Sequence, residues 1–438
     1  MEQNLQLGNN AKIAIIGAGA AGLIAAKNLR DIGLFQVEVF EETDTVGGTW
    51  VYQEEVATSY YFQSSMYRDL HTNLPKEIMG FLHFPFDDTF GVSSFPSHQV
   101  VLKYLVSFCK TFQLYELIRF HCSVKQISRF EYFGGFHWDL VLYNHGTQQV
   151  EQRRYDAVVV CNGHYTKPYI PEIPGADLFL RPIIHSHFYK SPEPFCKLRI
   201  AVLGAGNSGI DISYELSRMA SKVSLCHRKC QIRKTIGKNL EECPTIESLE
   251  ADGKILLADK SSLQVDILIL CTGYEYDFPF LDSSCEVFVQ DRVVLPLYRH
   301  LIHAKYPTMS FVGLPLRVLP FPLFDYQTRY LASIYSGKCT LPSCERMLVE
   351  QQEHLVDLDS KGCRKYYHLF AEKQWEYCRE LADLANGPRL SVAVQRVYED
   401  VSQFRKKEPE KYRRRKYIIF GKGPNDWRVF ENDSDVTL

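Results

Sequence analysis

The chain has 438 residues, which is above the usual size of a single domain, so we expect two domains or one large domain with an insertion. Hydrophobic residues make up 45% of the chain and charged residues 23%, a balance that is typical of a folded globular protein and excludes a disordered or membrane-embedded one. The net charge of −2 gives no electrostatic reason to expect nucleic acid as a partner.

The thirteen cysteines are scattered along the chain, several of them inside apolar runs such as "VVVCNG" and "LILCTG". This placement is typical of buried thiols in a reducing compartment. No C-x-x-C pair occurs, which argues against a redox dithiol and a structural zinc site, so we expect no metal. The amino terminus lacks the apolar core of a signal peptide, and no apolar run reaches the roughly 18 residues of a membrane span. We therefore expect a cytoplasmic protein without a transmembrane anchor.

Two copies of a strand, glycine turn, helix and strand pattern organise the sequence. In the first copy strands are predicted at residues 13–16 and 37–40, and in the second at residues 200–203 and 223–226. Downstream of each copy lies an unbroken apolar strand, in "YDAVVVCNGHY" and "VDILILCTGY", and this continuous apolarity indicates burial on both faces of a sheet. We therefore expect an α/β fold with two Rossmann-like dinucleotide-binding domains.

The first glycine turn has the G-x-G-x-x-G spacing, with Gly17, Gly19 and Gly22 between a predicted strand and a helix that ends near residue 30. This is the context that a dinucleotide-binding fingerprint requires. The first glycine permits the tight turn, the second lets a pyrophosphate approach the backbone, and the third lets the helix pack closely against the strand. Glu41 follows 19 residues after the last glycine, close to the offset of about 20 at which a carboxylate meets the ribose hydroxyls.

The second glycine turn repeats this spacing, with Gly204, Gly206 and Gly209 ahead of a helix that is predicted to end near residue 219. Ser208 lies in the same turn. Its hydroxyl could donate to a pyrophosphate, or the residue could serve only as a helix N-terminal residue. The repeated spacing predicts a second dinucleotide site.

The charge that follows the two turns differs in sign. The residue 19 positions after the second turn is Arg228, where the first copy has Glu41. A guanidinium pairs with a 2′-phosphate that a carboxylate would repel, so we expect NADPH in the second site. His227 and Arg233 add to the local positive character, although Arg228 could also be an ordinary exposed residue at a strand end. Two dinucleotides in one chain imply that NADPH delivers hydride to a partner that holds two electrons, which indicates FAD in the first site.

The order of these elements predicts the domain organisation. Residues 163–175 are rich in Pro and Gly and form a predicted linker. We assign residues 1–175 to the first part of an FAD-binding domain, 176–297 to an inserted NADPH-binding domain, and 298–438 to the second part of the FAD-binding domain. Its C-terminal helices are predicted between residues 343 and 386, where apolar residues recur at three- and four-residue intervals.

Five ordered motifs resemble the flavin-containing monooxygenase family, the class B flavoprotein monooxygenases that oxygenate nitrogen or sulfur. They are "GAGAAG", "VFEETDTVGGTW", "MYRDLHTNLPKEIMGF", "GAGNSGIDI" and "CTGY", and together they cover most of the chain. The resemblance implies that Asn73 lies near the reactive edge of the flavin ring, although Asn73 could instead cap a helix. It further implies cofactor contacts for Gly47, Gly48, Thr49, Trp50, Thr72, Leu74, Val124 through its backbone, Thr272 and Gly273.

A sixth motif, "FLRPIIHSHFYK", resembles the identifying sequence of the same family. Phe179, His185, Tyr189 and Lys190 are in register with it, whereas Arg181 stands where the family has Gly. The related Baeyer–Villiger monooxygenases carry Trp at the position of Tyr189, which favours the nitrogen- and sulfur-oxygenating branch. His185 could also be an exposed histidine of the linker.

The resemblance implies a reaction in which NADPH reduces FAD, oxygen adds to the reduced ring as a C4a-hydroperoxide, and a small nucleophile takes up the distal oxygen. Asn73 and retained NADP⁺ would hydrogen-bond the peroxide while the closed site excludes water. The sequence shows no G-x-S-x-G nucleophile turn and no metal-ligand spacing, and this cofactor chemistry needs neither. The substrate stays open between amines, thioethers and the thiols that fungal members of the family oxidise.

Other classes of function also stay open. An NADPH oxidase-like flavoprotein would release H₂O₂, and a nucleotide-binding sensor would bind FAD without turnover. A flavin reductase acting on a disulfide would need a thiol pair that the sequence lacks. The sequence also leaves open whether the chain forms a homodimer.

A basic tract, "FRKKEPEKYRRRKY", covers residues 404–417. Such a run is typical of a solvated face, with a nuclear signal or a peripheral contact to a membrane surface as alternatives. Many members of the flavin-containing monooxygenase family end in a hydrophobic anchor, whereas this chain ends in the polar "FENDSDVTL". That difference argues against membrane residence.

Overall fold

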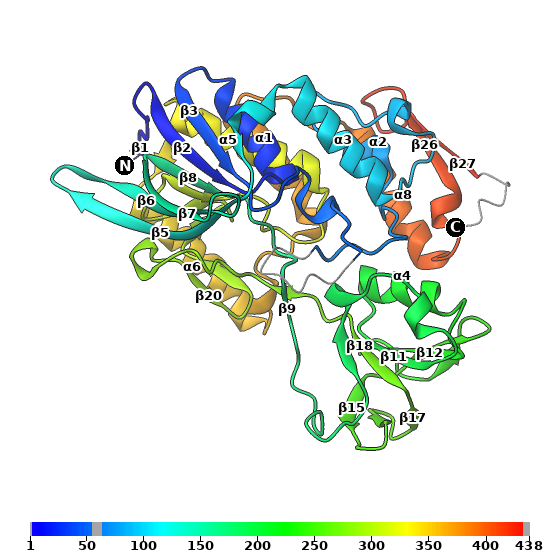
Figure 1. Cartoon of the computed structure of the whole chain (residues 1–438). Helices are drawn as coiled ribbons and strands as arrows, with labels where there is room; N and C mark the ends of the chain where they lie inside the picture. The colour runs from blue at the N-terminus through cyan, green and yellow to red at the C-terminus, as the bar shows by residue number, and fades with distance from the viewer. Residues whose placement is uncertain (1, 55–63, 432–438) are drawn as a thin grey trace. The chain divides into compact units, whose positions relative to one another are not determined.

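The computed structural model describes residues 2–54 and 64–431 (Figure 1). The chain divides into two compact units. Unit 1 comprises Met1–Val51, His71–His164 and Tyr276–Leu438, and unit 2 comprises Tyr52–Leu70 and Tyr165–Glu275. Unit 2 is therefore inserted into the chain of unit 1 at two points. The domain boundaries expected near residues 175 and 297 stay a prediction, because this division describes packing and not independent folding.

Unit 1 is built on a seven-stranded sheet in the order β22-β23-β24-β8-β2-β3-β4. In this order the strands are Leu297–Tyr298, Ile302–His303, Met309–Phe311, Ala157–Val160, Ala11–Ile16, Phe35–Phe40 and Ile118–Arg119. The strands from β24 to β4 pair in parallel, whereas β22 and β23 pair antiparallel. The chain passes from β2 to β3 on one side and reaches β8 on the other. The first glycine turn therefore lies at a topological switch point, where α/β sheets bind ligands.

Alternate residues of β2 enter two different cores. Ile13 and Ile15 pack on one face of the sheet, and Ala14 and Ile16 pack on the other. Successive side chains of a strand point to opposite faces, so a strand that is covered on both faces is apolar throughout. The first face is covered by α1 (Ala20–Arg30) and α5 (Pro320–Tyr335), and the second by the sheet of β5 (Cys122–Tyr132), β6 (Gly135–Asn144) and β7 (Gln149–Tyr155), as Figure 1 shows.

Further helices of unit 1 are α2 (Lys76–Met79), α3 (His98–Thr111), α6 (Cys344–Ser360), α7 (Gln374–Leu384) and α8 (Val392–Lys407). Two-stranded sheets pair β1 (Glu2–Gln3) with β25 (Leu341–Pro342), β20 (Phe288–Gln290) with β21 (Val293–Leu295), and β26 (Arg415–Ile419) with β27 (Trp427–Glu431). Among the helices in the described part of the chain, none has both the length and the apolarity needed to cross a membrane.

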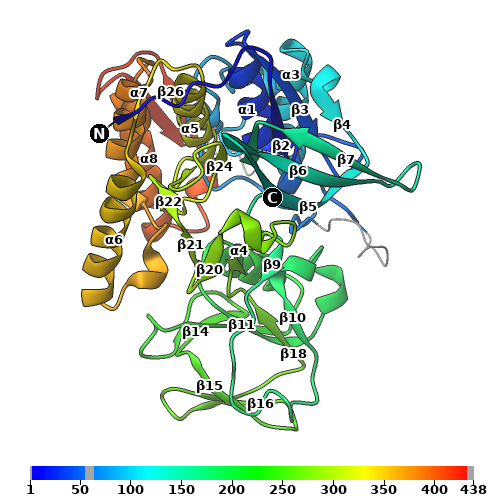
Figure 2. The same ribbon diagram turned by 90° about the vertical axis from the view of Figure 1, so that its left-hand side faces the viewer.

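Unit 2 is built on a six-stranded sheet in the order β10-β18-β11-β12-β14-β13. In this order the strands are Ile183–His185, Ile267–Leu270, Arg199–Leu203, Lys222–Cys226, Leu240–Cys243 and Lys234–Thr235. The pairs from β10 to β14 are parallel, and β13 is antiparallel to β14. A smaller sheet joins β15 (Ile246–Leu249), β16 (Lys254–Leu257) and β17 (Ser262–Gln264), and β9 (Lys167–Pro168) pairs with β19 (Tyr274–Glu275), as Figure 2 shows in part.

Helix α4 (Asn207–Leu216) follows β11 through the second glycine turn. It ends three residues before the predicted residue 219, because the chain tightens there: the N–H groups of Arg218 and Met219 donate to the carbonyls of Glu215 and Leu216, three residues back. The two apolar strands that follow the two copies, β8 and β18, occupy equivalent places beside β2 and β11. The expected α/β fold with two Rossmann-like units is confirmed.

Candidate functional site

The first glycine turn, between β2 and α1, is packed too tightly for side chains. Gly17 has a φ of +102°, and a Cβ added to it would lie 2.7 Å from the carbonyl oxygen of Cys161. A Cβ on Gly22 would lie 1.8 Å from the carbonyl oxygen of Gly17. Helix α1 begins after Gly19 with no side-chain cap and no acidic residue in its first turn. An uncapped helix N-terminus offers N–H groups and a positive dipole end, so this turn can hold an anion.

The two glycines of the "GGTW" motif, Gly47 and Gly48, pack against this turn. The N–H of Gly47 donates to the carbonyl of Ala18 at 3.1 Å. A Cβ on Gly48 would lie 3.1 Å from the Cα of Gly19, and a Cβ on Gly19 would lie 3.6 Å from the Cα of Gly48. Both loop glycines have positive φ, +124° for Gly47 and +54° for Gly48. Two bare backbones thus face each other, which is the surface that a pyrophosphate can approach closely.

Glu41 is buried at the end of β3 and is tied to the glycine turn. Its Oε2 accepts the N–H of Ala18 at 2.8 Å, and its Oε1 accepts the N–H and the hydroxyl of Thr43 at 2.9 and 2.8 Å. These bonds fix the carboxylate of Glu41 beside the first glycine turn, as its spacing from Gly22 predicts. Its contact with a ribose stays a prediction.

The second glycine turn, between β11 and α4, repeats the geometry of the first. Gly204 has a φ of +110°, and a Cβ added to it would lie 2.5 Å from the carbonyl oxygen of Cys271. A Cβ on Gly209 would lie 1.8 Å from the carbonyl oxygen of Gly204, the same distance as in the first turn. Gly206 differs, because a Cβ there would meet nothing within 4 Å. Helix α4 has no side-chain cap and no acidic residue in its first turn, and Ser208 is exposed in that turn.

Arg228 follows β12 and is exposed, and no carboxylate of the described residues forms an ion pair with it. The two residues expected to strengthen its positive character do not do so. Arg233 is paired with Glu241 through two bonds, of 2.9 and 2.6 Å. Burial lowers the pKa of His227, which keeps its ring neutral. The positive charge available for a phosphate therefore belongs to Arg228 and its exposed neighbours.

Asn73 lies half-buried just before α2. The alternative that it caps this helix is wrong, because the N-cap residue is Pro75 and no side chain caps the helix. The N–H of Thr72 donates to the carbonyl of Pro96 at 2.9 Å, while its buried hydroxyl has no hydrogen-bond partner among the described residues. Leu74 packs between two apolar cores. The segment is thus anchored on both sides of Asn73, with an unsatisfied hydroxyl next to it.

The C-terminal basic tract holds this segment in place. The guanidinium of Arg413 donates to the carbonyls of Thr72 and His71, at 3.0 and 3.3 Å. It stacks over the ring of Tyr412, which is buried and meets Phe95 edge to face at 5.3 Å. Arg413 therefore supports the backbone directly before Asn73. No local sequence signal could have found this bond, because it joins residues 341 positions apart.

A second contact of the basic tract involves a buried lysine. Lys76 is fully buried, and its ammonium pairs with Asp88 at 2.6 Å, which also pairs with Lys416 at 3.0 Å. The bonds from Lys76 and Lys416 hold the pKa of Asp88 below its ordinary value. The N–H of Tyr417 donates to the hydroxyl of Ser94 at 2.9 Å. The expectation of a solvated face is thus wrong for this part of residues 404–417, which is built into unit 1.

The remaining expected contacts lie at backbone irregularities and turns. Val124 borders a register shift of β5, where the pairing with β6 skips one residue. The hydroxyl of Thr272 donates to the carbonyl of Tyr169 at 2.5 Å, and Gly273 has a φ of +85°. Thr49 and Trp50 are half-buried in the 3-10 turn Gly48–Trp50.

The identifying motif is structural within unit 2. His185 is buried, and the alternative of an exposed linker histidine is wrong. Its Nδ1 accepts the N–H of His187 at 3.1 Å, so its Nε2 carries the proton and donates to the carbonyl of Gly273 at 3.0 Å. His185 thereby fixes the turn that holds the expected cofactor contacts Thr272 and Gly273.

The other members of the motif have distinct surroundings. Phe179 and Tyr189 are buried in apolar cores, and the ammonium of Lys190 donates to the carbonyls of Ser64 and Met66 at 2.7 and 3.2 Å. Arg181, which replaces the Gly of the pattern, is exposed, and its side chain lies against Gly253.

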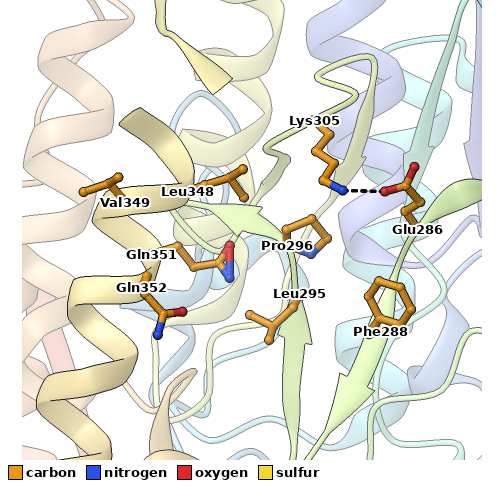
Figure 3. Close-up of a pocket in the computed structure, with 9 residues that line it drawn as sticks. All are labelled: Glu286, Phe288, Leu295, Pro296, Lys305, Leu348, Val349, Gln351 and Gln352. Atoms are coloured by element: carbon orange, nitrogen blue, oxygen red, sulfur yellow. Dashed lines mark hydrogen bonds and ion pairs between the residues drawn. The ribbon is translucent and has the colours of Figure 1, made fainter. Parts of the chain in front are cut away.

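A pocket of about 410 Å³ lies in unit 1 between the β20–β21 hairpin and helix α6 (Figure 3). Lys305 and Glu286 form an ion pair of 2.6 Å at its side, and Phe288 and Leu295 supply apolar surface. None of the residues expected at the cofactor sites lines it. We assign no chemistry to this pocket.

Two mostly parallel sheets, each with a glycine turn between a strand and the following helix, define a protein with two Rossmann-like units, the architecture typical of dinucleotide-binding proteins. The particular family follows from comparison with known proteins. The chain belongs to the flavin-binding monooxygenase-like family, whose model matches residues 10–240 and 241–394. It is a flavoprotein monooxygenase, as the resemblance of its motifs implies, and its reaction uses O₂ and a small-molecule substrate.

Relatives with assigned names agree with this family. The flavin-containing monooxygenase FMO GS-OX-like 4 of Arabidopsis thaliana is 37% identical over 421 residues, covering 92% of this chain and 93% of the relative. The solved S-allyl-L-cysteine S-oxygenase of Allium sativum is 35% identical with a TM-score of 0.87, covering 92% of this chain and 95% of that one. Tmm from Pelagibacter has the same fold, with 24% identity, a TM-score of 0.81 and 96% of each chain covered.

Proposed function

We propose that the chain binds FAD in unit 1 and NADPH in unit 2, and that it oxygenates the sulfur of small thioethers with O₂. The observation that carries the cofactor assignment is the pair of glycine turns. They share one geometry, yet a buried carboxylate, Glu41, follows the first and an exposed guanidinium, Arg228, follows the second. A carboxylate suits ribose hydroxyls, and a guanidinium suits the 2′-phosphate that only NADPH carries.

The residues of unit 1 fit a bound FAD. The backbones of Gly19 and Gly48 pack directly against each other with no side chain on either residue, and the N-terminus of α1 is uncapped. The buried Thr72 hydroxyl has a free hydrogen-bonding capacity beside Asn73. When bound, FAD would supply electron storage and the activation of oxygen. The protein then has to bind and orient FAD and the substrate, and to exclude water from the space between them.

The residues of unit 2 fit NADPH by the same reasoning. The uncapped N-terminus of α4 offers N–H groups to the pyrophosphate, and Gly206 leaves room for its close approach. Arg228 offers a charge that no carboxylate of the described residues competes for. Ser208, exposed in the first turn of α4, can donate its hydroxyl to the same anion.

Asn73 is proposed to act as a hydrogen-bond donor at the reactive edge of the flavin. Its segment is held by the Thr72 bond to Pro96, by the Arg413 bonds and by the packing of Leu74, so its amide needs little reorganisation. A donor that is fixed in a water-poor site stabilises developing negative charge on oxygen more strongly than water does. The amide thereby keeps activated oxygen from leaving as H₂O₂.

The substrate class rests on relatives and on chemistry. The Allium sativum relative, at 35% identity, is named for oxygenation at the sulfur of S-allyl-L-cysteine. A thioether sulfur has its own lone pair and needs no general base from the protein, which agrees with a fold whose catalytic power lies in the cofactor. A tertiary amine also has a lone pair, so the sulfur substrate of this relative is what favours a thioether over an amine or a free thiol.

The test compares wild type with Asn73→Ala and Asn73→Asp in the presence of NADPH, O₂ and S-allyl-L-cysteine. Wild type is expected to form sulfoxide with NADPH consumption. Both variants should retain FAD and its reduction by NADPH but release H₂O₂ in place of sulfoxide, because an alanine cannot donate and a carboxylate only accepts. Full sulfoxide yield in Asn73→Ala would refute the role of this amide. Wild type that consumes NADPH and forms only H₂O₂ with thioethers, amines and thiols alike would be an oxidase, and the proposal would fail.

A further inference from the structure

A histidine, a cysteine and a glutamate meet in unit 2 at the end of β12. The candidate ligand atoms of His227, Cys230 and Glu242 all lie within 4.8 Å of one another. The N–H of Cys230 donates to the carbonyl of His227 at 3.2 Å, which closes a turn and brings their side chains together. Glu242 belongs to the neighbouring strand β14, where it pairs with Leu225. His227 comes two residues after Leu225 and therefore points to the same face as Glu242.

The imidazole of His227 is left without hydrogen bonds. Both ring nitrogens are buried and have no hydrogen-bond partner among the described residues. The nearest carboxylate oxygen, Oε1 of Glu242, lies 3.9 Å from Nε2, which is too long for a hydrogen bond. A buried polar atom without a partner needs an explanation, and a ligand bound beside it is one.

The two other side chains are arranged to complete a site. Oε2 of Glu242 pairs with the ammonium of Lys234 at 2.6 Å, which leaves Oε1 turned toward His227. Cys230 is buried, and its thiol makes a weak bond of 3.2 Å to the carbonyl of Ile232. A thiolate, an imidazole and a carboxylate are the three donors that bind zinc in proteins.

We propose that His227, Cys230 and Glu242 form a binding site for a thiophilic divalent cation, with Zn²⁺ the best match. The three side chains supply nitrogen, sulfur and oxygen, and water would complete a tetrahedron. Ca²⁺ and Mg²⁺ are excluded as preferred ions, because both require oxygen ligands. Ligand atoms around zinc lie roughly 3.5 Å apart, given bonds of about 2.0–2.3 Å, so binding draws this cluster together. The thiol proton is released to solvent when the metal binds.

Sequence spacing gave no sign of this site. The expectation of no metal rested on the lack of paired cysteines, whereas this cluster uses one cysteine and draws its glutamate from another strand. The site stands on the geometry of unit 2 and does not depend on the proposed cofactors. Because His227 precedes Arg228, a bound dication also fixes the turn that the proposed function assigns to the 2′-phosphate.

The test uses the full chain with its flavin, freed of metal by a chelator. Co²⁺ is added first as a spectroscopic probe, and Zn²⁺ then displaces it, while equilibrium dialysis gives the stoichiometry. We expect one Zn²⁺ per chain and a thiolate-to-cobalt absorption band. Cys230→Ser should abolish this band, and His227→Gln and Glu242→Gln should each weaken Zn²⁺ binding at least tenfold.

Cys196→Ser is the matched control, because Cys196 is an exposed cysteine of the same unit. It should leave the band and the affinity unchanged. The proposal is overturned if wild type binds no stoichiometric Zn²⁺, or if Cys230→Ser and Glu242→Gln bind it as wild type does. Thermal unfolding without metal identifies a variant that fails to fold. If Cys230→Ser fails to fold, the Zn²⁺ affinity of Glu242→Gln, which keeps the shape of the side chain, tests the proposal instead. Both results are independent of whether the protein forms sulfoxide.

Discussion

The second and third glycines of the second turn, Gly206 and Gly209, are expected to fail in different ways when each is replaced by alanine. In Gly209→Ala the new Cβ would lie 1.8 Å from the carbonyl oxygen of Gly204, whereas real Cβ atoms keep at least 3.0 Å from such atoms. Helix and turn must therefore separate by about 1.2 Å, and overpacking of this kind costs about 1–3 kcal/mol or more. Alanine regains about 1 kcal/mol in helix propensity, so the net loss of stability is up to about 2 kcal/mol when overpacking costs about 3 kcal/mol.

In Gly206→Ala the new Cβ meets no protein atom within 4 Å, and the backbone, at φ −78° and ψ −171°, suits any residue. The change at the N-cap costs less than about 1 kcal/mol. The methyl group instead occupies the space that the pyrophosphate needs. We expect the Kd for NADP⁺ to rise at least tenfold, which corresponds to about 1.4 kcal/mol.

Urea unfolding and NADP⁺ titration of both variants separate these effects. Gly209→Ala should lower the unfolding midpoint of the chain, and Gly206→Ala should lower it less while losing affinity for NADP⁺. Wild-type affinity in Gly206→Ala would refute the assignment of this turn to a dinucleotide. An unchanged midpoint in Gly209→Ala would refute the packing argument.

Three further predictions concern single charged or titratable groups. Arg228→Gln should raise the Kd for NADPH at least tenfold and leave that for NADH unchanged, and an equal loss for both would exclude a 2′-phosphate contact. Arg413→Ala removes two bonds to backbone carbonyls, so sulfoxide formed per NADPH should fall while FAD content stays, with exposed Arg414→Ala as the control that should match wild type. Burial, and to a smaller extent the nearby His354 and Lys373, lowers the pKa of His300 from its ordinary 6.5 to about 3. Below pH 6.5 the unfolded chain therefore binds a proton that the folded chain does not. The free energy of unfolding should therefore fall as pH drops below 6.5, by up to about 1.4 kcal/mol per pH unit for this group, and His300→Gln should flatten the slope seen by urea unfolding.

The parts of the fold that the sequence predicted well are those with a local physical cause. Gly17 and Gly204 predict their turns because the positive φ and the close carbonyl oxygen at these positions exclude other residues. The corresponding strands of the two units, β8 and β18, were predicted because a strand that is buried on both faces is apolar at every position. The end of α4 was missed by three residues, since a helix and the tighter turn that follows it have the same apolar pattern.

The candidate site was predicted only where its residues belong to a local sequence motif, such as the two glycine turns. The support of Asn73 by Arg413 depends on the chain returning to residue 72 after 341 residues, which no spacing rule foresees. The same holds for the cluster of His227, Cys230 and Glu242, because the pairing of β12 with β14 brings the glutamate in. The burial of His185 was equally hidden, since its partner, the carbonyl of Gly273, carries no side-chain signal.

The central claim is that this chain couples NADPH oxidation to the transfer of one oxygen atom from O₂ to sulfur. It is tested most directly by reducing the flavin-bound protein anaerobically with one equivalent of NADPH, then adding isotopically labelled O₂ and S-allyl-L-cysteine. The account predicts flavin reduction before oxygen is added, followed by close to one labelled sulfoxide per NADPH. Unlabelled sulfoxide, or H₂O₂ equal to the NADPH consumed with no sulfoxide, would contradict it.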